Sequence, residues 1–151
     1  MINCFDGEFA FLSNFYESPI KYNGTVTMPT VEHYFQAAKA AEPLDFLKIA
    51  AADTPGQAKR LGRKCKLRAD WEEKKIDVMR QALKLKFADP TLKAKLIATG
   101  DEELVEGTTW HDRFWGVCHC EKCQGHGENH LGRLLMELRN EYMEENENEV
   151  H

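Results

Sequence analysis

The sequence predicts an α+β fold in which helices dominate and strands are few and short. Apolar residues recur at helical spacing over long segments, most clearly over 70–87 and 129–143. Capping residues precede most of the predicted helices, and at two of them, Thr54 and Asp89, a proline follows at the first helical position. Strand signals are confined to residues 1–29 and to the region before the last helix. Together these observations favour one compact, mostly helical domain with a few short strands.

The beginning of the chain predicts a β-hairpin. It is rich in aromatic and turn-forming residues, and the pair Asn23-Gly24 separates two short β-prone runs at 20–22 and 25–27. Asn-Gly is a strong signal for a tight turn, because both residues tolerate positive φ. We therefore expect two antiparallel strands ahead of the first helix.

Three helices are expected to follow the hairpin. Thr30 has the position of an N-cap, so the first helix is predicted from this residue to Glu42. A short helix is expected over 46–51. The third begins at Thr54, where a proline comes next and a glutamine three residues later completes a capping box, and it is predicted to stop at Gly62.

The second half of the chain is predicted to add two more helices, two short strands and a final helix. Aspartates cap the first two helices, a glycine ends the second, and leucines at core spacing mark the last. The expected ranges are 70–87 and 89–100 for the two helices, 103–106 and 113–117 for the strands, and 129–143 for the final helix. The acidic residues beyond it are expected to fray.

Composition limits the class of protein. The 151 residues suit one domain, which we place at 1–143 with an acidic tail at 144–151. Hydrophobic content of 42% and a net charge of -5 describe an ordinary soluble protein without the basic tract of a broad nucleic-acid binder. No run approaches the length of a membrane span, and five cysteines fit a closed disulfide framework poorly. A cytoplasmic location without membrane contact is therefore expected.

The first predicted helix carries a polar stripe. Glu32, Gln36 and Lys39 are spaced i, i+4 and i+7, so that a carboxylate, an amide and an amine lie one above another. Large aromatic residues, among them Tyr34 and Phe35, border this stripe. Such an arrangement is what a small polar pocket needs. The alternative is the solvated face of an ordinary amphipathic helix.

A second group of candidate residues lies in the segment 109–116. Trp110 and Trp115 flank Asp112, and indole faces hold a planar base or a sugar by stacking, while a carboxylate orients a water or ribose hydroxyls. The alternative places both rings in the core and makes Asp112 a turn-forming residue. The glycine-rich segment 125–132 follows, and its backbone N–H groups at a helix start are a weak signal for phosphate binding.

Three cysteines and a histidine lie close together between these two signals. Cys118, Cys120, Cys123 and His126 have the ligand types of a small tetrahedral site for structural zinc, because zinc favours sulfur and nitrogen ligands at short spacing. The usual paired CxxC arrangement is absent. Reduced free cysteines and redox or nucleophilic chemistry are the alternatives, and a catalytic zinc is disfavoured because no H-x-E motif precedes the cysteines.

Together with further motifs, these residues resemble the NADAR (YbiA-like) family. The resemblance extends from about residue 5 to residue 140, in the family's order. Its longest parts are Leu12-Ser13-Asn14-Phe15-Tyr16 and the stretch from Thr30 to Lys39. The later parts are Ala58-Lys59 with Gly62-Arg63, Arg68-x-Asp70-Trp71, Lys86-Phe87, Thr99-Gly100, Leu104-x-Glu106, Asp112-x-x-Trp115-Gly116 and Gly127-x-Asn129-x-Leu131-Gly132. The cysteine-rich segment 118–126 departs from the family's commonest form.

The resemblance implies hydrolysis of an N-glycosidic bond between ribose C1 and an exocyclic nitrogen of a base. Cleavage develops positive charge at C1, which calls for a carboxylate, an aromatic clamp and donors for phosphate. By matched position, the catalytic residues are Glu32, Lys39 and Asp112. On the same basis, the substrate-binding residues are Asn14, Phe15, Tyr16, Gln36, Arg63, Trp110, Trp115, Gly116 and Asn129. No cofactor is required for this catalysis.

The roles of two residues and the substrate stay open at this point. Glu32 is expected to stabilise the developing cation or activate water, and Lys39 to protonate the leaving nitrogen or form a Schiff base with the opened sugar. Similar proteins act on ADP-ribosylated guanine or on phosphoribosylamino-pyrimidine intermediates of riboflavin synthesis. Because no riboflavin-enzyme domain accompanies the predicted domain, ADP-ribosylated guanine, as a nucleotide or within DNA or RNA, is the expected substrate. A non-catalytic ADP-ribose or nucleotide-binding module and a zinc-stabilised interaction module are the alternatives.

Overall fold

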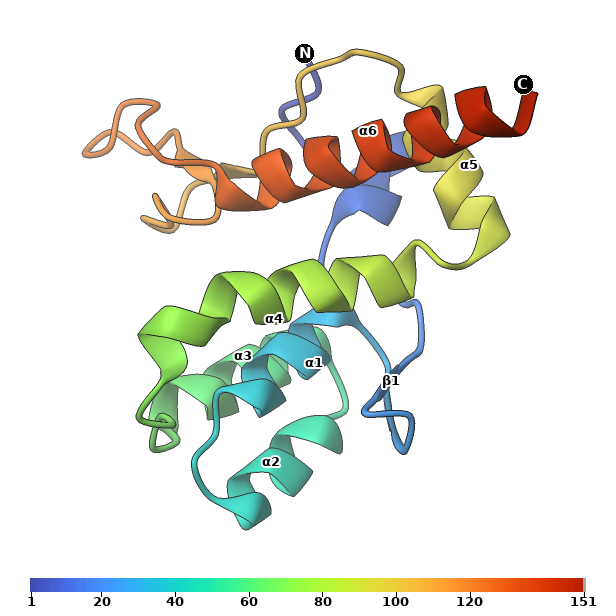
Figure 1. Cartoon of the computed structure of the whole chain (residues 1–151). Coiled ribbons are helices and arrows are strands. Elements are labelled where there is room, and N and C mark those ends of the chain that lie inside the picture. Colours follow the sequence, from blue (N-terminus) through green and yellow to red (C-terminus); the bar gives the residue numbers. More distant parts are fainter. Residues whose placement is uncertain (151) are drawn as a thin grey trace. The chain divides into compact units, whose positions relative to one another are not determined.

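The structure, a computed structural model, describes residues 1–150, with side chains described through residue 148. The chain folds into two compact units. Asn14–Lys86 form the α1–α4 unit, while Met1–Ser13 and the chain from Phe87 onward form the α5–α6 unit. Figure 1 colours the helices of both units along the sequence. The predicted, mostly helical α+β fold is confirmed. Within the described residues, no helix combines the length and apolar character that crossing a membrane requires.

The α1–α4 unit is built around one short helix. Its elements in chain order are β1 (Ile20–Tyr22), β2 (Val26–Met28), α1 (Val31–Ala38), α2 (Pro43–Ala50), α3 (Pro55–Lys64) and α4 (Trp71–Lys86). The helix α1 packs against α2, α3 and α4, and each of its 8 residues is buried. A helix enclosed in this way must satisfy the polar groups of its own side chains inside the unit.

The hairpin ahead of α1 has the predicted turn. β1 and β2 are antiparallel, with Tyr22 opposite Val26. Asn23 and Gly24 have φ angles of 49° and 72°, and the N–H of Thr25 closes the turn by donating to the carbonyl of Tyr22 at 3.0 Å. Positive φ at both central residues matches the right-handed twist of the strands. The second strand begins one residue later than predicted, because Thr25 belongs to the turn.

Thr30 caps α1 as predicted and also fixes a buried histidine. The hydroxyl of Thr30 accepts from the backbone N–H of His33 at 3.1 Å and lies 2.8 Å from Nδ1 of the same residue. Nε2 of His33 lies 2.9 Å from the carbonyl of Ala52. We assign the proton to Nε2, which donates to that carbonyl, so that Nδ1 accepts from the Thr30 hydroxyl. The imidazole thereby links the start of α1 to the segment between α2 and α3.

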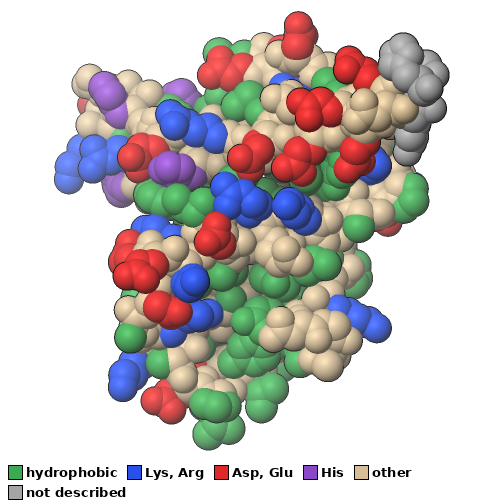
Figure 2. Space-filling model, in the orientation of Figure 1, with side chains coloured by type: hydrophobic (Ala, Val, Ile, Leu, Met, Phe, Trp, Pro, Cys, Tyr) green, Lys and Arg blue, Asp and Glu red, His purple; other side chains and the backbone are tan. Residues whose placement is uncertain are grey.

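The α5–α6 unit combines helices with one small parallel sheet. Its elements are the 3-10 helix η1 (Gly7–Leu12), α5 (Pro90–Ala98), β3 (Gly107–Thr108), β4 (Val117–Cys118) and α6 (His130–Val150), with β3 and β4 parallel. The helices α5 and α6 pack against each other, and Arg139 of α6 donates to the hydroxyl of Thr99 at 2.9 Å. Acidic side chains follow one another along α6 (Figure 2).

Three helices of the α1–α4 unit have boundaries that differ from the prediction. The second, α2, begins at Pro43 instead of residue 46, because the proline takes the first helical position after Glu42. The first helix ends at Ala38 instead of Glu42, because the chain turns to pair with the segment after α3, where the N–H of Ala41 donates to the carbonyl of Lys66 at 2.9 Å. The helix α3 continues through Gly62. Glycine at this position serves close packing between helices and does not end the helix.

The strands and the last helix of the α5–α6 unit also differ from the prediction. The segments 103–106 and 113–117 were expected to be strands, but β3 begins just after the first of them and β4 overlaps the second only at Val117. Within the first segment, Leu104 forms a single bridge with Ile2. The acidic residues expected to fray continue α6 as far as Val150. The last residue of the predicted tail, 151, lies outside the described residues.

We expect Thr30→Ala to lower the free energy of unfolding by about 1–2 kcal/mol. The change removes the N-cap of α1 and leaves Nδ1 of the buried His33 without its donor. Urea denaturation followed by circular dichroism measures the effect. Thr30→Ser keeps the hydroxyl and serves as the control, with a clearly smaller loss. Equal losses in the two variants would show that the hydroxyl is unimportant.

Candidate active site

A carboxylate and an amide lie inside the α1–α4 unit. Glu32 and Gln36 are one turn apart on α1, and the two residues are only 6% and 5% exposed. Nε2 of Gln36 donates to Oε1 of Glu32 at 2.9 Å. Glu32 belongs to the first turn of α1, where the helix dipole favours negative charge. Two of the three residues of the predicted polar stripe are therefore buried, so the stripe is not a solvated helix face.

Asn14 lies beside the start of α1 and, like Gln36, has a buried side-chain oxygen without a donor among the described residues. Its backbone carbonyl accepts from the N–H of Glu32 at 3.0 Å, and its Nδ2 donates to the sulfur of Met79 at 3.7 Å. The side-chain oxygens of Asn14 and Gln36 are buried and have no hydrogen-bond donor among the described residues. A buried acceptor without a donor is costly and rare. The two oxygens therefore fit a ligand that presents hydroxyl or N–H groups.

Lys39 occupies the C-cap of α1, at the end of the same stripe. Its carbonyl accepts from the N–H of Arg68 at 2.9 Å, which holds the helix end against the segment after α3. Burial lowers the pKa of Lys39 below its ordinary value of 10.5, although the thiol of Cys65 and the carboxylate of Glu32 act in the opposite direction. At a given pH, more of this amine is neutral than of an exposed lysine.

Two cationic side chains of α3 act on Lys39. Arg63 and Lys59 are one turn apart, and their positive charges help to lower the pKa of Lys39. Together they offer positive charge to an anionic group such as a phosphate. Arg63 was predicted from the sequence as a phosphate contact, whereas Lys59 was noted only in the matched pair Ala58-Lys59, and contact of either residue with a phosphate stays a prediction.

The helices α1 and α3 approach each other closely at Gly62. A Cβ atom at this position would lie 2.0 Å from Oε1 of Gln36 and 2.9 Å from Cε of Lys39. The positions of both side chains therefore require glycine. This role was missed because only the packing of two helices against each other reveals it.

The aromatic residues predicted beside Asn14 differ in their surroundings. Phe15 is 44% exposed and presents part of its ring to solvent. The ammonium of the buried Lys86 lies 5.6 Å from the ring centre of Tyr16. Phe15 is the next residue after Asn14, and its ring is exposed. Phe15 is therefore a better candidate than Tyr16 for stacking on a ligand.

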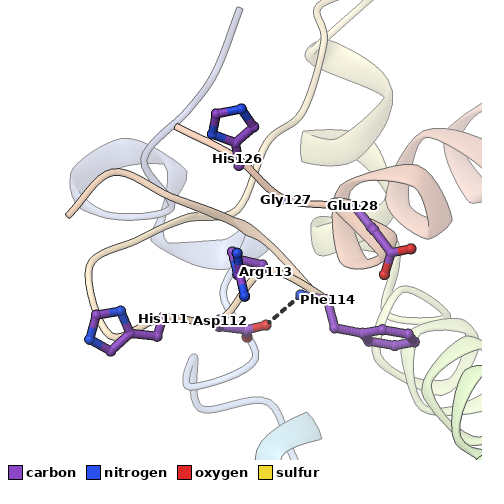
Figure 3. Close-up of a pocket in the computed structure, with 7 residues that line it drawn as sticks. All are labelled: His111, Asp112, Arg113, Phe114, His126, Gly127 and Glu128. Carbon is purple, nitrogen blue, oxygen red and sulfur yellow. Dashed lines mark hydrogen bonds between the residues drawn. The ribbon is translucent and has the colours of Figure 1, made fainter. Parts of the chain in front are cut away.

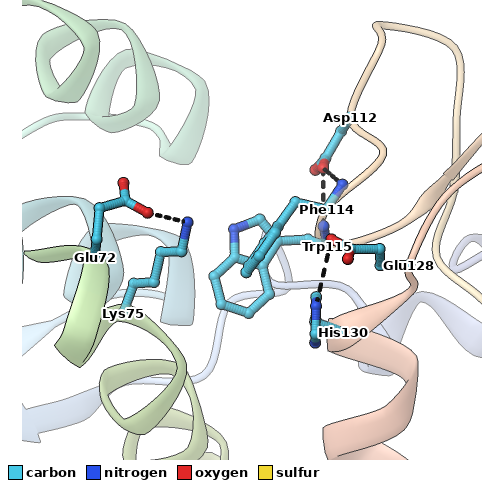
Figure 4. A network of polar contacts seen from close by, with 7 residues as sticks. All are labelled: Glu72, Lys75, Asp112, Phe114, Trp115, Glu128 and His130. Atoms are coloured by element: carbon cyan, nitrogen blue, oxygen red, sulfur yellow. Dashed lines mark hydrogen bonds and ion pairs between the residues drawn. The ribbon is translucent and has the colours of Figure 1, made fainter.

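In the α5–α6 unit, Asp112 shapes a turn. Its Oδ1 accepts from the N–H groups of Phe114 at 3.1 Å and Trp115 at 2.9 Å (Figure 4). This is the turn-forming alternative of the sequence interpretation, and a catalytic role for Asp112 stays a prediction. An open hollow of about 700 Å³ lies at this turn, lined by residues 111–114 and 126–128 (Figure 3).

The two predicted tryptophans of this unit are placed differently. Trp115 meets the ring of Phe114 edge-on, with centroids 4.8 Å apart, and Phe114 in turn lies 4.3 Å from the ring of His130 (Figure 4). Trp110 is 51% exposed. Trp115 is thus part of an aromatic cluster, while the exposure of Trp110 suits stacking on a planar ligand.

Four N–H groups at the start of α6, the predicted phosphate site, already have partners within the protein. The N–H groups of Glu128, Asn129, His130 and Leu131 donate to the carbonyls of residues 113–116, at 2.7 to 3.3 Å. A helix start binds anions through N–H groups that lack an intrahelical partner. Here these four groups hold the preceding loop, and phosphate binding by this segment stays a prediction.

Asn129 and Gly116, which were predicted to contact substrate, hold the α5–α6 unit together. Nδ2 of Asn129 donates to the carbonyl of Leu104 at 2.9 Å, and its Oδ1 accepts from the N–H of Glu106 at 3.0 Å. A Cβ atom on Gly116 would lie 2.3 Å from the carbonyl oxygen of Glu106. Both residues therefore serve close packing, and their contact with a substrate stays a prediction.

The predicted cysteine cluster is present, but with a different histidine. The ligand atoms of His111, Cys118, Cys120 and Cys123 all lie within 4.8 Å of one another. Nδ1 of His126 instead donates to the carbonyl of Cys123 at 2.8 Å, and Figure 3 shows the two imidazoles at different edges of the hollow. His111 was missed because it precedes the first cysteine of the cluster by 7 residues. A group of residues compatible with structural zinc is thus confirmed, with one ligand corrected.

Comparison with known proteins places this geometry in a family. Residues 4–143 match the NADAR domain. The chain belongs to the NADAR domain family. The chain is 43% identical over 135 residues to the N-glycosidase YbiA of Escherichia coli strain K12, a match that covers 87% of this chain and 81% of that protein. The family membership predicted from the sequence is therefore confirmed.

Two further relatives are larger proteins. The riboflavin biosynthesis protein VVA0006 of Vibrio vulnificus is 40% identical over 142 residues, which cover 92% of this chain and 37% of that protein. The chloroplastic riboflavin biosynthesis protein PYRR of Zea mays is 40% identical over 152 residues, which cover 89% of this chain and 24% of that protein.

The fold comparison agrees with the family assignment. The NMR structure of the YbiA protein of E. coli is similar to this structure, with a TM-score of 0.80 and 39% identity. The match covers 97% of this chain and 87% of that one. The likeness therefore extends over both units.

We expect Gly62→Ala to reduce turnover of a ribosylated substrate by about a hundredfold. The added methyl group displaces the Gln36 amide and the Lys39 stem by about 1 Å, a misplacement that is costly in an active site. The fold should persist, because the displaced atoms end flexible side chains. Steady-state kinetics together with thermal denaturation measure both effects.

Gly56→Ala is the matched control for Gly62→Ala. It also lies on α3, but the nearest atom to its Cβ would be the Thr54 hydroxyl oxygen at 4.0 Å, so turnover should stay near the wild-type value. Unchanged turnover in both variants would contradict the proposed importance of the close approach at Gly62.

Proposed function

We propose that this protein is an N-glycosidase that hydrolyses the bond between ribose C1 and an exocyclic base nitrogen, and that its substrate is ADP-ribosylated guanine. The observation that carries the proposal is the buried group of Glu32 and Gln36 on α1, with Lys39 at the helix end. The name of the YbiA relatives supports the reaction class. The choice of substrate is supported by the chemistry of this group.

Glu32 supplies the negative charge that the reaction needs. As the C1–N bond lengthens, positive charge develops on C1 and the ring oxygen of the sugar. A carboxylate in a site with little water stabilises this charge more strongly than one in solvent. The hydrogen bond from the Gln36 amide at 2.9 Å orients the carboxylate for this role.

The remaining polar groups fit a ribose that carries phosphates. The ribose hydroxyls would donate to the side-chain oxygens of Asn14 and Gln36, which are otherwise buried without a donor. The phosphates would pair with Lys59 and Arg63, whose positive charges act on the same region as Lys39. An ADP-ribosyl group would satisfy both sets of partners.

Lys39 is proposed to act as the nucleophile. Its neutral amine displaces the base at C1, and the proton that the amine loses goes to the leaving nitrogen. The sugar opens to give a Schiff base, which water hydrolyses to release ADP-ribose and the free amine. The lowered pKa of Lys39 supports this route, because burial outweighs the opposing charge of Glu32. The carboxylate, the amine and water supply all groups for this chemistry, so it requires no cofactor.

A phosphoribosylamino-pyrimidine is the second candidate substrate. The specific observation in its favour is the 40% identity to proteins named for riboflavin biosynthesis. This compound also joins ribose C1 to an exocyclic nitrogen, and it carries a phosphate for the cations of α3.

The direct test offers both substrates to the purified protein and measures the released base by liquid chromatography. We expect release from ADP-ribosylated guanosine with the higher kcat/KM. Release from the phosphoribosylamino-pyrimidine alone would replace the proposed substrate. Binding without release of either base, unchanged in Glu32→Gln, would identify a non-catalytic reader and overturn the enzymatic proposal.

We expect Glu32→Gln and Lys39→Ala each to lower turnover by at least about a hundredfold, because each removes a group that acts on the reacting atoms. Circular dichroism should show that both variants stay folded. Glu73→Gln and Lys48→Ala change the same residue types at exposed positions of α4 and α2 and should leave turnover near the wild-type value. Wild-type turnover in both Glu32→Gln and Lys39→Ala would contradict the assignment of these residues to the active site.

The pH dependence of kcat/KM distinguishes the two roles of Lys39. A neutral nucleophile requires loss of a proton, so kcat/KM should rise with pH until the lowered pKa of Lys39 is passed, with a midpoint below 10.5. A charged lysine that acts as an acid would give the opposite slope. Borohydride added during turnover should trap the sugar on Lys39, which mass spectrometry detects. A falling profile without a trapped adduct would exclude the Schiff-base route.

A further inference from the structure

We propose that His111, Cys118, Cys120 and Cys123 together bind one zinc ion, which fastens the loop before Asp112 to the loop after β4. The ligand atoms of the four residues lie within 4.8 Å of one another. The histidine comes from the loop between β3 and β4, whereas Cys118 is the last residue of β4 and the other two cysteines lie in the loop after it. Three sulfurs and one imidazole nitrogen form a common set of ligands for structural zinc.

The distances inside this cluster are close to those of a tetrahedral site. Bond lengths of about 2.3 Å to sulfur and about 2.05 Å to nitrogen place neighbouring sulfur and nitrogen ligands about 3.6 Å apart. Nδ1 of His111 lies 3.3 Å from Sγ of Cys120 and 3.4 Å from Sγ of Cys123. Both distances need only a few tenths of an ångström of expansion to accept the metal. The imidazole therefore already faces the sulfurs through the nitrogen that would coordinate.

Backbone N–H groups point at two of the sulfurs. The N–H of His111 donates to Sγ of Cys118, and the N–H of Cys123 donates to Sγ of Cys120, both at 3.3 Å. Such donors orient thiolate ligands and stabilise their negative charge, and they are typical of the surroundings of metal-bound cysteine. A cluster of neutral thiols in a core has no need of them.

The backbone around the cluster is held in an unusual conformation. His111 has a φ of 69° and Gln124 a φ of 51°, in the left-handed region that non-glycine residues seldom occupy. The second loop is closed by two bonds of Cys118, whose N–H donates to the carbonyl of His126 at 3.0 Å and whose carbonyl accepts from Gly125 at 2.8 Å. Four bonds to a metal ion would offset the energetic cost of this backbone conformation, because they connect the two segments directly.

Neither His126 nor a disulfide explains the cluster as well. Nδ1 of His126 already donates to the carbonyl of Cys123, so its role is to close the loop. A disulfide would use two of the three cysteines and leave the third thiol beside an imidazole. Four protein ligands leave no open position for water, which makes the site structural and not catalytic. Sulfur-rich tetrahedral ligand sets select zinc among the abundant divalent ions.

The zinc ion would determine the conformation of the segment that holds Asp112. His111 is its direct neighbour, and the turn made by the Asp112 carboxylate follows at once. Loss of the metal should therefore loosen residues 107–129 and leave the backbone of the α1–α4 unit as it is. Hydrogen exchange with and without a chelator measures this, and equal exchange in residues 107–129 would contradict the structural role.

Elemental analysis of the full chain, purified without chelators, tests the metal itself. We expect about one equivalent of zinc in the wild type and less than about a tenth of an equivalent in His111→Ala and Cys120→Ser. His126→Ala is the matched control and should keep the metal. His111→Cys should also keep it, because four cysteines form an equally suitable zinc site.

A second measurement covers variants that fail to fold. Co²⁺ added to metal-free wild type should give the sulfur-to-cobalt absorbance of a tetrahedral thiolate site, and Zn²⁺ should displace it. Less than about a tenth of an equivalent of zinc in the wild type, with no cobalt absorbance, would overturn the proposal. Loss of zinc in His126→Ala with retention in His111→Ala would overturn the ligand assignment.

Discussion

The complete burial of α1 is the constraint on which the α1–α4 unit depends. Burial of a carboxylate is costly by several kcal/mol unless polar groups compensate for the lost water. For Glu32 these are the amide of Gln36 at 2.9 Å and the positive end of the helix dipole. This hydrogen bond uses the nitrogen of Gln36 and leaves its oxygen directed at Gly62, where a side chain would not fit. The requirement for glycine on α3 thus follows from the compensation of a charge on α1.

The same burial explains the chemistry of the helix end. Lys39 extends the stripe of Glu32 and Gln36, but it sits at the C-cap, where the chain leaves α1 to pair with the segment after α3. Desolvation lowers its pKa, and two cations of α3 contribute in the same direction. The group therefore combines the negative charge of the Glu32 carboxylate with an amine that loses its proton more readily than an exposed lysine does. This combination suits a reaction in which a cation develops at a sugar carbon while an amine attacks it.

Features that depend on residues near one another in the sequence could be predicted from it. The cap of Thr30 and the stripe on α1 act over a few positions, and both are as expected. Features set by distant segments could not. The sequence indicated a substrate contact for Asn129, which stays a prediction, but it did not indicate that the amide of this residue binds the backbone of residues 104–106. The short spacing of the cysteines indicated three ligands, whereas His111 joins them only because β3 and β4 pair side by side.

The central claim is that a sugar binds at the buried group of α1. Titration of ¹⁵N-labelled protein with ADP-ribose, followed through the side-chain amide signals in the NMR spectrum, tests it most directly. Donation of ribose hydroxyls to the oxygens of Asn14 and Gln36 should shift the amide signals of these two residues at saturation. Saturable binding that leaves both amide signals unmoved, or no binding at all, would contradict the account.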